Sequence, residues 1–361
     1  MKKIKYLLLI LLLCGCSTNN IVENENNNTN QETTNIEIKN DKTVVILATG
    51  GTIAGSGEQG KETGYKSGSL SVESLIEAVP GIDEVANIET IQVCNVNSDD
   101  INDNIWIELA NTINELAKND NVSGFVITHG TDTLEETAYF LNLTVKTDKP
   151  VVLTGSMRPA TSISADGPMN LYQSVCVASN DNAKAKGVLV VFSDKIYSAR
   201  SVVKTSTYDV MAISAGETGC IGIVRNNEVY FYEEPLKLHT INSQFDITGI
   251  EKLPEVNIVY FNVDANPKVL EYTASFSDGI VIAGAGAGEF SQQYIEIINK
   301  LKIPVVVSSR IDDGLITQDA VLCPNTIAAN NLSPQKAAIL LKLSLLNKTN
   351  FDELLNIFNE Y

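Results

Sequence analysis

From residue 43 onward, short apolar runs alternate with segments whose apolar residues recur at helical spacing. Such runs, bounded by turn residues, predict buried parallel strands. The expected strands are residues 44–47, 89–93, 125–127, 151–153 and 188–192, and the expected helices between them are residues 72–78, 100–117, 133–143 and 169–178. Alternation of this kind indicates an α/β fold, with a doubly wound sheet in the first part of the chain.

The pattern changes after residue 220. Residues 221–225 and 228–232, joined at Asn226-Asn227, predict an added hairpin, and residues 233–254 form a polar, turn-rich linker. A smaller α/β unit follows, with strands at 258–261, 279–283 and 304–307 and helices at 268–274, 291–300 and 351–358. Ser333-Pro334 provides the N-cap and first-turn proline of a helix over 335–346. We therefore expect a larger N-terminal domain over 43–232 and a smaller C-terminal domain over 255–361.

The first 42 residues have a different character. Lys2, Lys3 and Lys5 precede the apolar run 7–13, which is too short to span a membrane and has the length of a signal-peptide core. The stretch 13–16 resembles a bacterial lipobox. It predicts a lipoprotein signal peptide over 1–15, with Cys16 as the lipid anchor; an ordinary cleaved signal is the alternative. Residues 16–42, rich in Asn, Thr and Glu, indicate a flexible tether. The expected location is exported and lipid-anchored at the cell envelope, in the periplasm or on the outer cell surface.

Charge and composition narrow the function. The net charge is −18, and removal of residues 1–15 takes away three lysines and no acids, which leaves about −21. That charge opposes binding to nucleic acid or to an anionic membrane face, so the lipid is the expected membrane contact. The chain has only two histidines, and neither has a metal ligand at suitable spacing, so we expect neither metal nor cofactor. The cysteines at 94, 176, 220 and 323 lack CxxC spacing and are expected to be buried thiols.

The candidate chemistry rests on two threonines. Thr52 and Thr131 each lie in a glycine-containing turn directly after an expected strand. The carboxyl ends of parallel strands are where open α/β sheets bind ligands, so both hydroxyls are expected at the site. A threonine nucleophile needs a base and an orienting group. Lys204 and Asp132 are candidates for those roles, and Tyr65 lies in the glycine-rich loop after Thr52, from which it can close over a substrate.

Two other features have structural interpretations. His129, beside the second turn, is expected to be a structural hydrogen bonder rather than a functional histidine. The glycines at 55, 57 and 60 match part of a dinucleotide or phosphate-binding motif, but they begin several residues after the strand and Glu62 stands where a phosphate site needs Ser or Thr. A mobile glycine-rich loop is the favoured interpretation.

Four segments together are similar to a known family. ATGGTIAG at 48–55, HGTDTLEETAYFL at 129–141, the segment 155–168 (GSMRPATSISADGP) and SPQKA at 333–337 resemble the bacterial exported, type II L-asparaginases. The similarity runs in order from about residue 43 to the C-terminus. It implies hydrolysis of the L-asparagine side-chain amide to L-aspartate and ammonia through an acyl-enzyme, with some activity on L-glutamine. It also implies a homotetramer made of two close dimers, with sites shared between subunits.

The resemblance assigns roles to individual residues. Thr52 would be the nucleophile and Tyr65 its hydroxyl partner, while Thr131, Lys204 and Asp132 would form a second set that aids activation and positions water. The implied substrate-binding residues are Gly51, Ser98, Asp99, Gly130 and Ser156. Ser98 falls where the family binds the α-carboxylate, and a place at the start of the helix expected over 100–117 suits an anion. A plain N-cap is its alternative interpretation.

This chain departs from the family pattern at the rim of the site. Asp99 stands where many relatives carry Gln or Glu, Ala287 where they carry Asn or Ser in a glycine-rich loop, and Val321 where a glutamate is common. These changes bear on substrate preference and leave the nucleophile set untouched. The alternative function from another class is a lipid-anchored amino-acid-binding protein without turnover.

Overall fold

The structure, a computed structural model, describes residues 41–347 and 349–361. The expected signal peptide, its lipidation site Cys16 and nearly all of the expected tether lie outside the described residues. Within the described part, none of the helices has both the length and the apolar character needed to cross a membrane.

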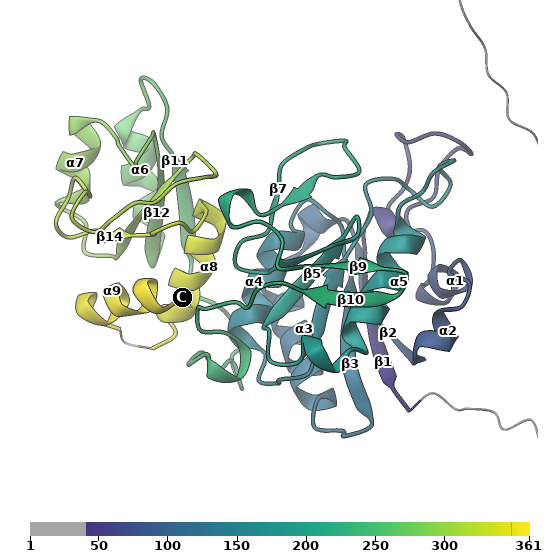
Figure 1. Cartoon of the computed structure of the whole chain (residues 1–361). Coiled ribbons are helices and arrows are strands. Elements are labelled where there is room, and N and C mark those ends of the chain that lie inside the picture. Colours follow the sequence, from purple (N-terminus) through teal and green to yellow (C-terminus); the bar gives the residue numbers. More distant parts are fainter. Residues whose placement is uncertain (1–40, 348) are drawn as a thin grey trace, which may run out of the picture. The chain divides into compact units, whose positions relative to one another are not determined.

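The larger of the two main sheets has eight strands (Figure 1). They are β1 (Thr43–Gly50), β2 (Asn87–Val96), β3 (Val122–Thr128), β4 (Val151–Thr154), β5 (Val188–Phe192), β6 (Lys195–Ser198), β9 (Gly222–Arg225) and β10 (Glu228–Phe231). Their order is β10-β9-β6-β5-β4-β3-β1-β2, and the strands from β5 to β2 are parallel. The parallel part therefore has the doubly wound order 2-1-3-4-5, in which the direction of winding reverses between β1 and β3.

Helices cover both faces of this sheet because its central strands are apolar on both sides. In β1, Val45 and Leu47 face one core, while Val44 and Ile46 face the other. The first core includes residues of α3 (Asp103–Leu116) and α4 (Leu134–Thr144); the second includes residues of α1 (Val72–Glu77), α2 (Ile82–Val85) and α5 (Gly167–Ala178). This arrangement confirms the α/β fold class expected from the sequence.

Three details of the larger sheet differ from the sequence interpretation. The run 89–93 belongs to β2, an edge strand in which no residue is fully buried. Strand β6 was missed because only a tight turn at Ser193-Asp194 separates it from β5, and it makes the sheet mixed rather than wholly parallel. Helix α3 begins at Asp103, not at residue 100, because Asn102 caps it.

The hairpin expected from the sequence is confirmed, since Asn226 and Asn227 have the positive φ angles, 48° and 68°, of a two-residue turn.

The smaller sheet is parallel throughout and belongs to the C-terminal part of the chain. Its strands, in sheet order, are β11 (Val256–Tyr260), β12 (Gly279–Gly284), β13 (Val305–Ser309) and β14 (Ile327–Ala328). Its helices are α6 (Pro267–Ala274), α7 (Gln292–Ile298), α8 (Pro334–Ser344) and α9 (Phe351–Glu360). The expected start of α8 is confirmed, because Ser333 caps it and Pro334 is its first residue. Strand β14 was missed because it is only two residues long.

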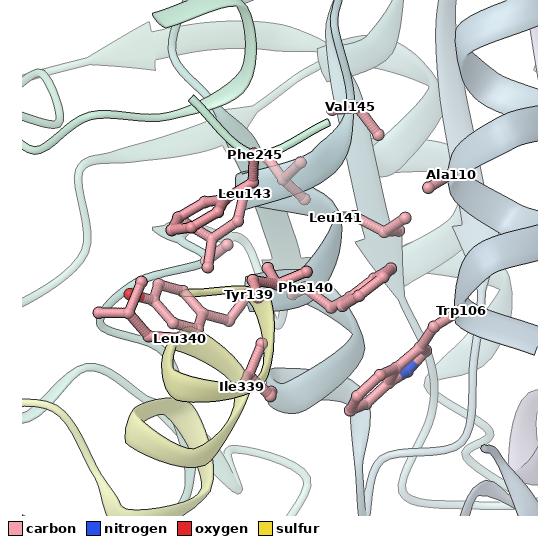
Figure 2. Close-up of a cluster of buried hydrophobic side chains, with 14 of the residues drawn as sticks. Trp106, Ala110, Tyr139, Phe140, Leu141, Leu143, Val145, Phe245, Ile339 and Leu340 are labelled. Carbon is pink, nitrogen blue, oxygen red and sulfur yellow. The ribbon is translucent and has the colours of Figure 1, made fainter. Parts of the chain in front are cut away.

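One hydrophobic core is common to the two sheets. It contains residues of α3 and α4, which cover the larger sheet, together with residues of α8, α9 and the smaller sheet. Figure 2 shows Ile339 and Leu340 of α8 beside Tyr139 of α4, with Phe245 above them. Phe245 comes from the segment that the sequence predicts to be a linker, and its ring centroid lies 5.0 Å from that of Tyr361. Helices α4 and α8 therefore pack directly against each other.

Candidate functional site

The two threonine turns lie side by side at the reversal point of the larger sheet. Strands β1 and β3 pair directly, and Thr49 donates a hydrogen bond to the carbonyl oxygen of Thr128 at 2.9 Å. Beyond the strands, the two turns approach so closely that a Cβ atom on Gly51 would lie 2.5 Å from the Cα atom of Gly130. Gly51 also has a φ of 77°, which favours glycine. The structure therefore brings both turns to one place, where doubly wound sheets bind ligands.

Thr52 begins a single 3₁₀ turn, η1 (Thr52–Ala54), directly after β1. Its side chain is almost buried, with 9% of the residue exposed. The Thr52 Oγ1 atom lies 2.8 Å from the Tyr65 hydroxyl oxygen, and either group can donate this hydrogen bond. Thr52 and Tyr65, which the sequence analysis assigned to one step, are therefore also in direct contact.

The loop that carries Tyr65 is held at its two ends and by one neighbouring segment. Ser56 and Lys66 exchange two backbone hydrogen bonds, which close the loop at its base. Thr161 accepts a hydrogen bond from the amide of Gly60 at 2.9 Å through its carbonyl oxygen, and the Arg158 Nε atom lies 3.0 Å from Glu62 Oε1. The middle of the loop is exposed. Its position over Thr52 therefore depends on a few polar contacts with the segment after β4.

Thr131, Asp132 and Lys204 form the second group. The Lys204 Nζ atom donates to Thr131 Oγ1 at 2.9 Å and to Asp132 Oδ1 at 2.5 Å. Thr131 is buried, and the Lys204 side chain is 17% exposed. Lys204 lies in β7 (Val203–Lys204), a two-residue strand that pairs with β8 (Ile213–Ser214) outside the larger sheet. The amine thus reaches the second turn from a separate, short element.

Sequence reasoning missed two buried charged residues behind this group. Glu135 of α4 accepts a hydrogen bond from the backbone amide of Lys204 at 2.8 Å. Lys336 of α8 donates from Nζ to the carbonyl oxygens of Arg200, at 3.0 Å, and of Val202. Burial is the main cause that raises the pKa of Glu135 and lowers that of Lys336 to about 8. The signal in the sequence was a lysine directly before the apolar run 337–341 of the SPQKA helix, at a position that is buried with that run.

His129 is a structural residue, as expected. It is fully buried, and its Nδ1 atom lies 2.7 Å from the carbonyl oxygen of Gly130, so Nδ1 must carry the proton and donate. Nε2 is then the acceptor for the Thr137 hydroxyl at 2.9 Å, and Thr137 accepts from the indole nitrogen of Trp106 at 2.8 Å. Burial lowers the pKa of His129 to about 4, so the ring is neutral near pH 7.

The residues expected to bind substrate are brought together only in part. Ser98 is buried in a 3₁₀ turn, η2 (Ser98–Asp100), and a Cβ atom on Gly130 would lie 2.7 Å from its hydroxyl oxygen, so these two residues lie in close contact. Ser98 does not open helix α3, which has its own cap, so the expected N-terminal anion site of that helix is wrong. Asp99 is exposed. Ser156 is fully buried and donates to the carbonyl oxygen of Arg158 at 2.8 Å.

The sequence also singled out a rim position, Ala287, and four cysteines. Ala287 is exposed in the loop after β12. Cys176 and Cys323 are buried thiols as expected, whereas Cys94 and Cys220 are only half-buried, so that prediction is wrong for them. Among residues 41–347 and 349–361, no three His, Cys, Asp or Glu side chains gather in the way that a metal site requires.

The geometry joins each of two threonine hydroxyls to a group that can carry a proton. One threonine hydroxyl meets a phenol, and a second meets a lysine amine that a carboxylate holds in place. Arrangements of this kind activate a hydroxyl for covalent catalysis. The two glycine-containing turns approach each other closely beside these groups.

Comparison with known proteins gives a consistent result along the chain. The family model described as "Asparaginase, N-terminal" matches residues 43–237, and the "Glutaminase/Asparaginase C-terminal domain" matches residues 255–358. The chain is 43% identical to L-asparaginase 2 of Escherichia coli (strain K12), over 88% of this chain and 93% of that protein. It is 41% identical to the glutaminase-asparaginase of Acinetobacter glutaminasificans, over 88% of this chain and 99% of that protein.

A solved structure agrees with these sequence relatives. The crystal structure of a probable cytoplasmic L-asparaginase from Campylobacter jejuni superimposes with a TM-score of 0.85 at 42% identity, covering 89% of this chain and 100% of that one. The matches include both sheets and both threonine turns in sequence order. The chain belongs to the asparaginase family.

Proposed function

We propose that this protein is an L-asparaginase, which hydrolyses the side-chain amide of L-asparagine to L-aspartate and ammonia and has some activity on L-glutamine. The observation that carries this proposal is the pair of hydroxyl groups at the reversal point of the sheet, Thr52 with Tyr65 and Thr131 with Lys204. The family membership and the names of the two sequence relatives, an L-asparaginase and a glutaminase-asparaginase, support it.

In the proposed reaction, Thr52 Oγ1 attacks the carbonyl carbon of the side-chain amide. Tyr65, 2.8 Å away, takes the hydroxyl proton and passes it to the amide nitrogen, which leaves as ammonia when the C–N bond breaks. An ester to Thr52 remains. Thr131, Lys204 and Asp132 orient a water molecule that attacks this ester. The water oxygen stays with the acid product, and a water proton returns to Thr52 Oγ1.

Substrate binding is proposed beside the two turns, next to the hydroxyls of Thr52 and Thr131. Gly51, Gly130 and Ser98 lie in close contact there, and the α-carboxylate of the substrate is proposed to bind beside Ser98. Asp132 and the exposed Asp99 supply negative charge for the α-ammonium group. Ser156 is proposed to act indirectly, because its hydroxyl already donates to Arg158 and thereby shapes the segment that contacts the Tyr65 loop.

The deciding experiment measures ammonia release from millimolar L-asparagine and L-glutamine by purified protein. Thr52→Ala is expected to abolish release from both, because the proposed ester forms on the Thr52 hydroxyl. Thr248→Ala, an exposed threonine on the surface, is the matched control and is expected to match wild type. Folded wild-type protein that binds either amino acid in calorimetry but releases no ammonia contradicts the proposal and favours a binding protein.

Export with a lipid on Cys16 is a second proposal, and it rests on the sequence of residues 1–16. The structural relative from Campylobacter jejuni is named as probable cytoplasmic. The location of this chain therefore has to be measured directly. The test follows the protein into membrane and soluble fractions of a producing bacterium, with incorporation of labelled fatty acid. Cys16→Ser is expected to lose the label, whereas Cys14→Ser, two residues away, is expected to keep it. Equal labelling of both variants contradicts the assignment.

We also propose a homotetramer of two close dimers. The smaller unit exposes large apolar side chains on neighbouring elements: Tyr260 in β11 and Tyr272 in α6 are 60% and 73% exposed, and Val263 between them is 89% exposed. Such a surface suits burial against another subunit. Light scattering after size-exclusion chromatography is expected to give the mass of four chains, and the mass of one chain would contradict the proposal.

A further inference from the structure

The backbone that carries Lys204 is held by two buried charged side chains from different helices. Lys336 of α8 is 1% exposed, and its amine binds the carbonyl oxygens of Arg200 and Val202. Glu135 of α4 is 8% exposed, and its carboxylate binds the amide of Lys204. Three backbone groups within five residues are therefore bound by side chains rather than by a sheet.

This segment needs such support because its own secondary structure is minimal. Strand β7 has two residues, and its partner β8 also has two. A pair of this length cannot fix a backbone by itself. Yet the amine of Lys204 must stay within hydrogen-bond distance of both Thr131 and Asp132, and catalytic groups tolerate errors of only a fraction of an ångström.

Charged side chains are a costly way to fill two buried positions. Buried ion pairs are costly to desolvate, and well-packed apolar residues of similar size often replace them without loss of stability. The charged groups that face Lys336 are Glu135 and Glu136, which favour its cation, and Arg200, which opposes it; burial outweighs them all. We therefore relate the charges of Lys336 and Glu135 to the backbone atoms of residues 200–204 that they bind.

We propose that Lys336 and Glu135 are positioning residues for Lys204, which together fix the 200–204 backbone so that the Lys204 amine meets Thr131. The inference rests on the proposed function, in which Lys204 serves the reaction. The inference assigns a function to Lys336 of the SPQKA segment. Because Lys336 lies in α8, the C-terminal part of the chain is then needed for the geometry of the site in the N-terminal part. Neither residue touches the substrate.

The first test replaces Lys336 with methionine, which has similar length and no charge. The kcat for L-asparagine is expected to fall at least about tenfold, because a displaced catalytic group costs rate, while KM changes less than about threefold. Lys342→Met is the matched control: it lies in the same helix, and its amine pairs with Asp103 at 3.0 Å, away from the 200–204 segment. The control is expected to keep kcat within about twofold of wild type, as expected for an ion pair that the site does not use.

Glu135 provides an independent test if Lys336→Met fails to fold. Glu135→Gln keeps an acceptor oxygen for the Lys204 amide, whereas Glu135→Leu removes it. The Leu variant is expected to lose several times more kcat than the Gln variant, at similar KM. Equal kcat values for Glu135→Leu and wild type overturn the inference, as does a Lys336→Met variant whose kcat equals that of wild type or of the Lys342→Met control.

Coupling to Lys204 separates positioning from a general structural effect. In a Lys204→Arg background, Lys336→Met is expected to lower kcat much less than in wild type, because residues that act through one another are not additive. The same fold loss in both backgrounds overturns the inference. Failure of the proposed function has a different signature, since wild-type protein would then release no ammonia.

Discussion

The two threonine turns occupy equivalent places on adjacent strands, yet they are held in opposite ways. Thr52 meets Tyr65, which belongs to a largely exposed loop fixed by a few polar contacts. Thr131 meets Lys204, whose backbone is bound by buried side chains from two helices. Under the proposed function, the partner of the first threonine belongs to the loop that can move for substrate entry, and the partner of the second is held in place by buried side chains.

The largest expected effect concerns the second turn, with Thr131 and Lys204, which we call the rigid side. Lys204→Met removes the amine that donates to Thr131 and Asp132, so the kcat for L-asparagine is expected to fall about 10³-fold. Steady-state ammonia release measures it. Lys118→Met, on the surface beside Glu115, is the control and is expected to match wild type. A loss smaller than about tenfold would show that the second turn contributes little to the chemistry.

The stability of the rigid side is expected to depend on pH through His129. Its pKa is about 4 when folded and 6.5 as an unperturbed side chain, so the unfolded state takes up the proton first as the pH falls. The stability present above pH 6.5 is lost as the pH falls towards 4, and the loss amounts to about 3 kcal/mol in the free energy of unfolding. Urea titrations between pH 7.5 and 4 measure it.

A variant isolates this contribution from those of other groups. On acidification, the free energy of unfolding of His129→Gln is expected to fall by about 3 kcal/mol less than that of wild type. Glu136 acts in the opposite direction: burial raises its pKa to about 7, so it favours the folded state at low pH in both proteins. Parallel pH profiles of wild type and His129→Gln would contradict the prediction.

On the loop side, Tyr65→Phe removes the hydroxyl that lies 2.8 Å from Thr52 Oγ1. A positioned proton-transfer group contributes about 10²-fold, so kcat is expected to fall by roughly that factor. Tyr208→Phe, which alters a 78% exposed tyrosine, controls for the loss of a phenol. If Tyr65→Phe raises KM and leaves kcat unchanged, Tyr65 covers the substrate without taking part in the proton transfer.

The smallest expected effect concerns the contact between the loop and the segment after β4. Glu62→Gln breaks the ion pair with Arg158, and because both groups are partly exposed the pair contributes at most about 1 kcal/mol. KM is expected to rise about threefold, and 1 M salt is expected to remove most of the difference. Glu58→Gln is the matched control, since its partner Lys61 lies in the same loop and does not tie it to the body. Equal KM values for the two variants would contradict a holding role for Glu62.

Sequence patterns predicted most of the fold because buried strands carry their own signal. The runs around Val126 and Val190 are apolar on both faces, as expected of strands that helices cover on both sides. Short or half-exposed pieces escaped. Strands β7 and β14 have only two residues each, β6 follows β5 after a tight turn, and β2, an edge strand, has no fully buried residue.

The candidate site divides in the same way. Thr52, Thr131 and their partners were found because turns after strands and family motifs mark them, and their contacts now support the proposed roles. Glu135 and Lys336 were missed because their value depends on backbone atoms that lie 69 and more than 130 residues away in the chain. Ser98 was placed on a helix start by spacing alone, whereas Asn102 caps that helix.

The hydrogen-bond chain under the second turn has a practical consequence. Trp106 is the only tryptophan of the chain, and it stacks on Phe140 at 5.0 Å while donating to Thr137, which in turn donates to His129. Excitation at the red edge of the absorption band therefore reports on one place, the hydrogen-bonded chain of Trp106, Thr137 and His129. Protonation of the buried His129 ring changes the surroundings of this fluorophore, so the emission of the unlabelled protein reports on the residues beside the second threonine turn.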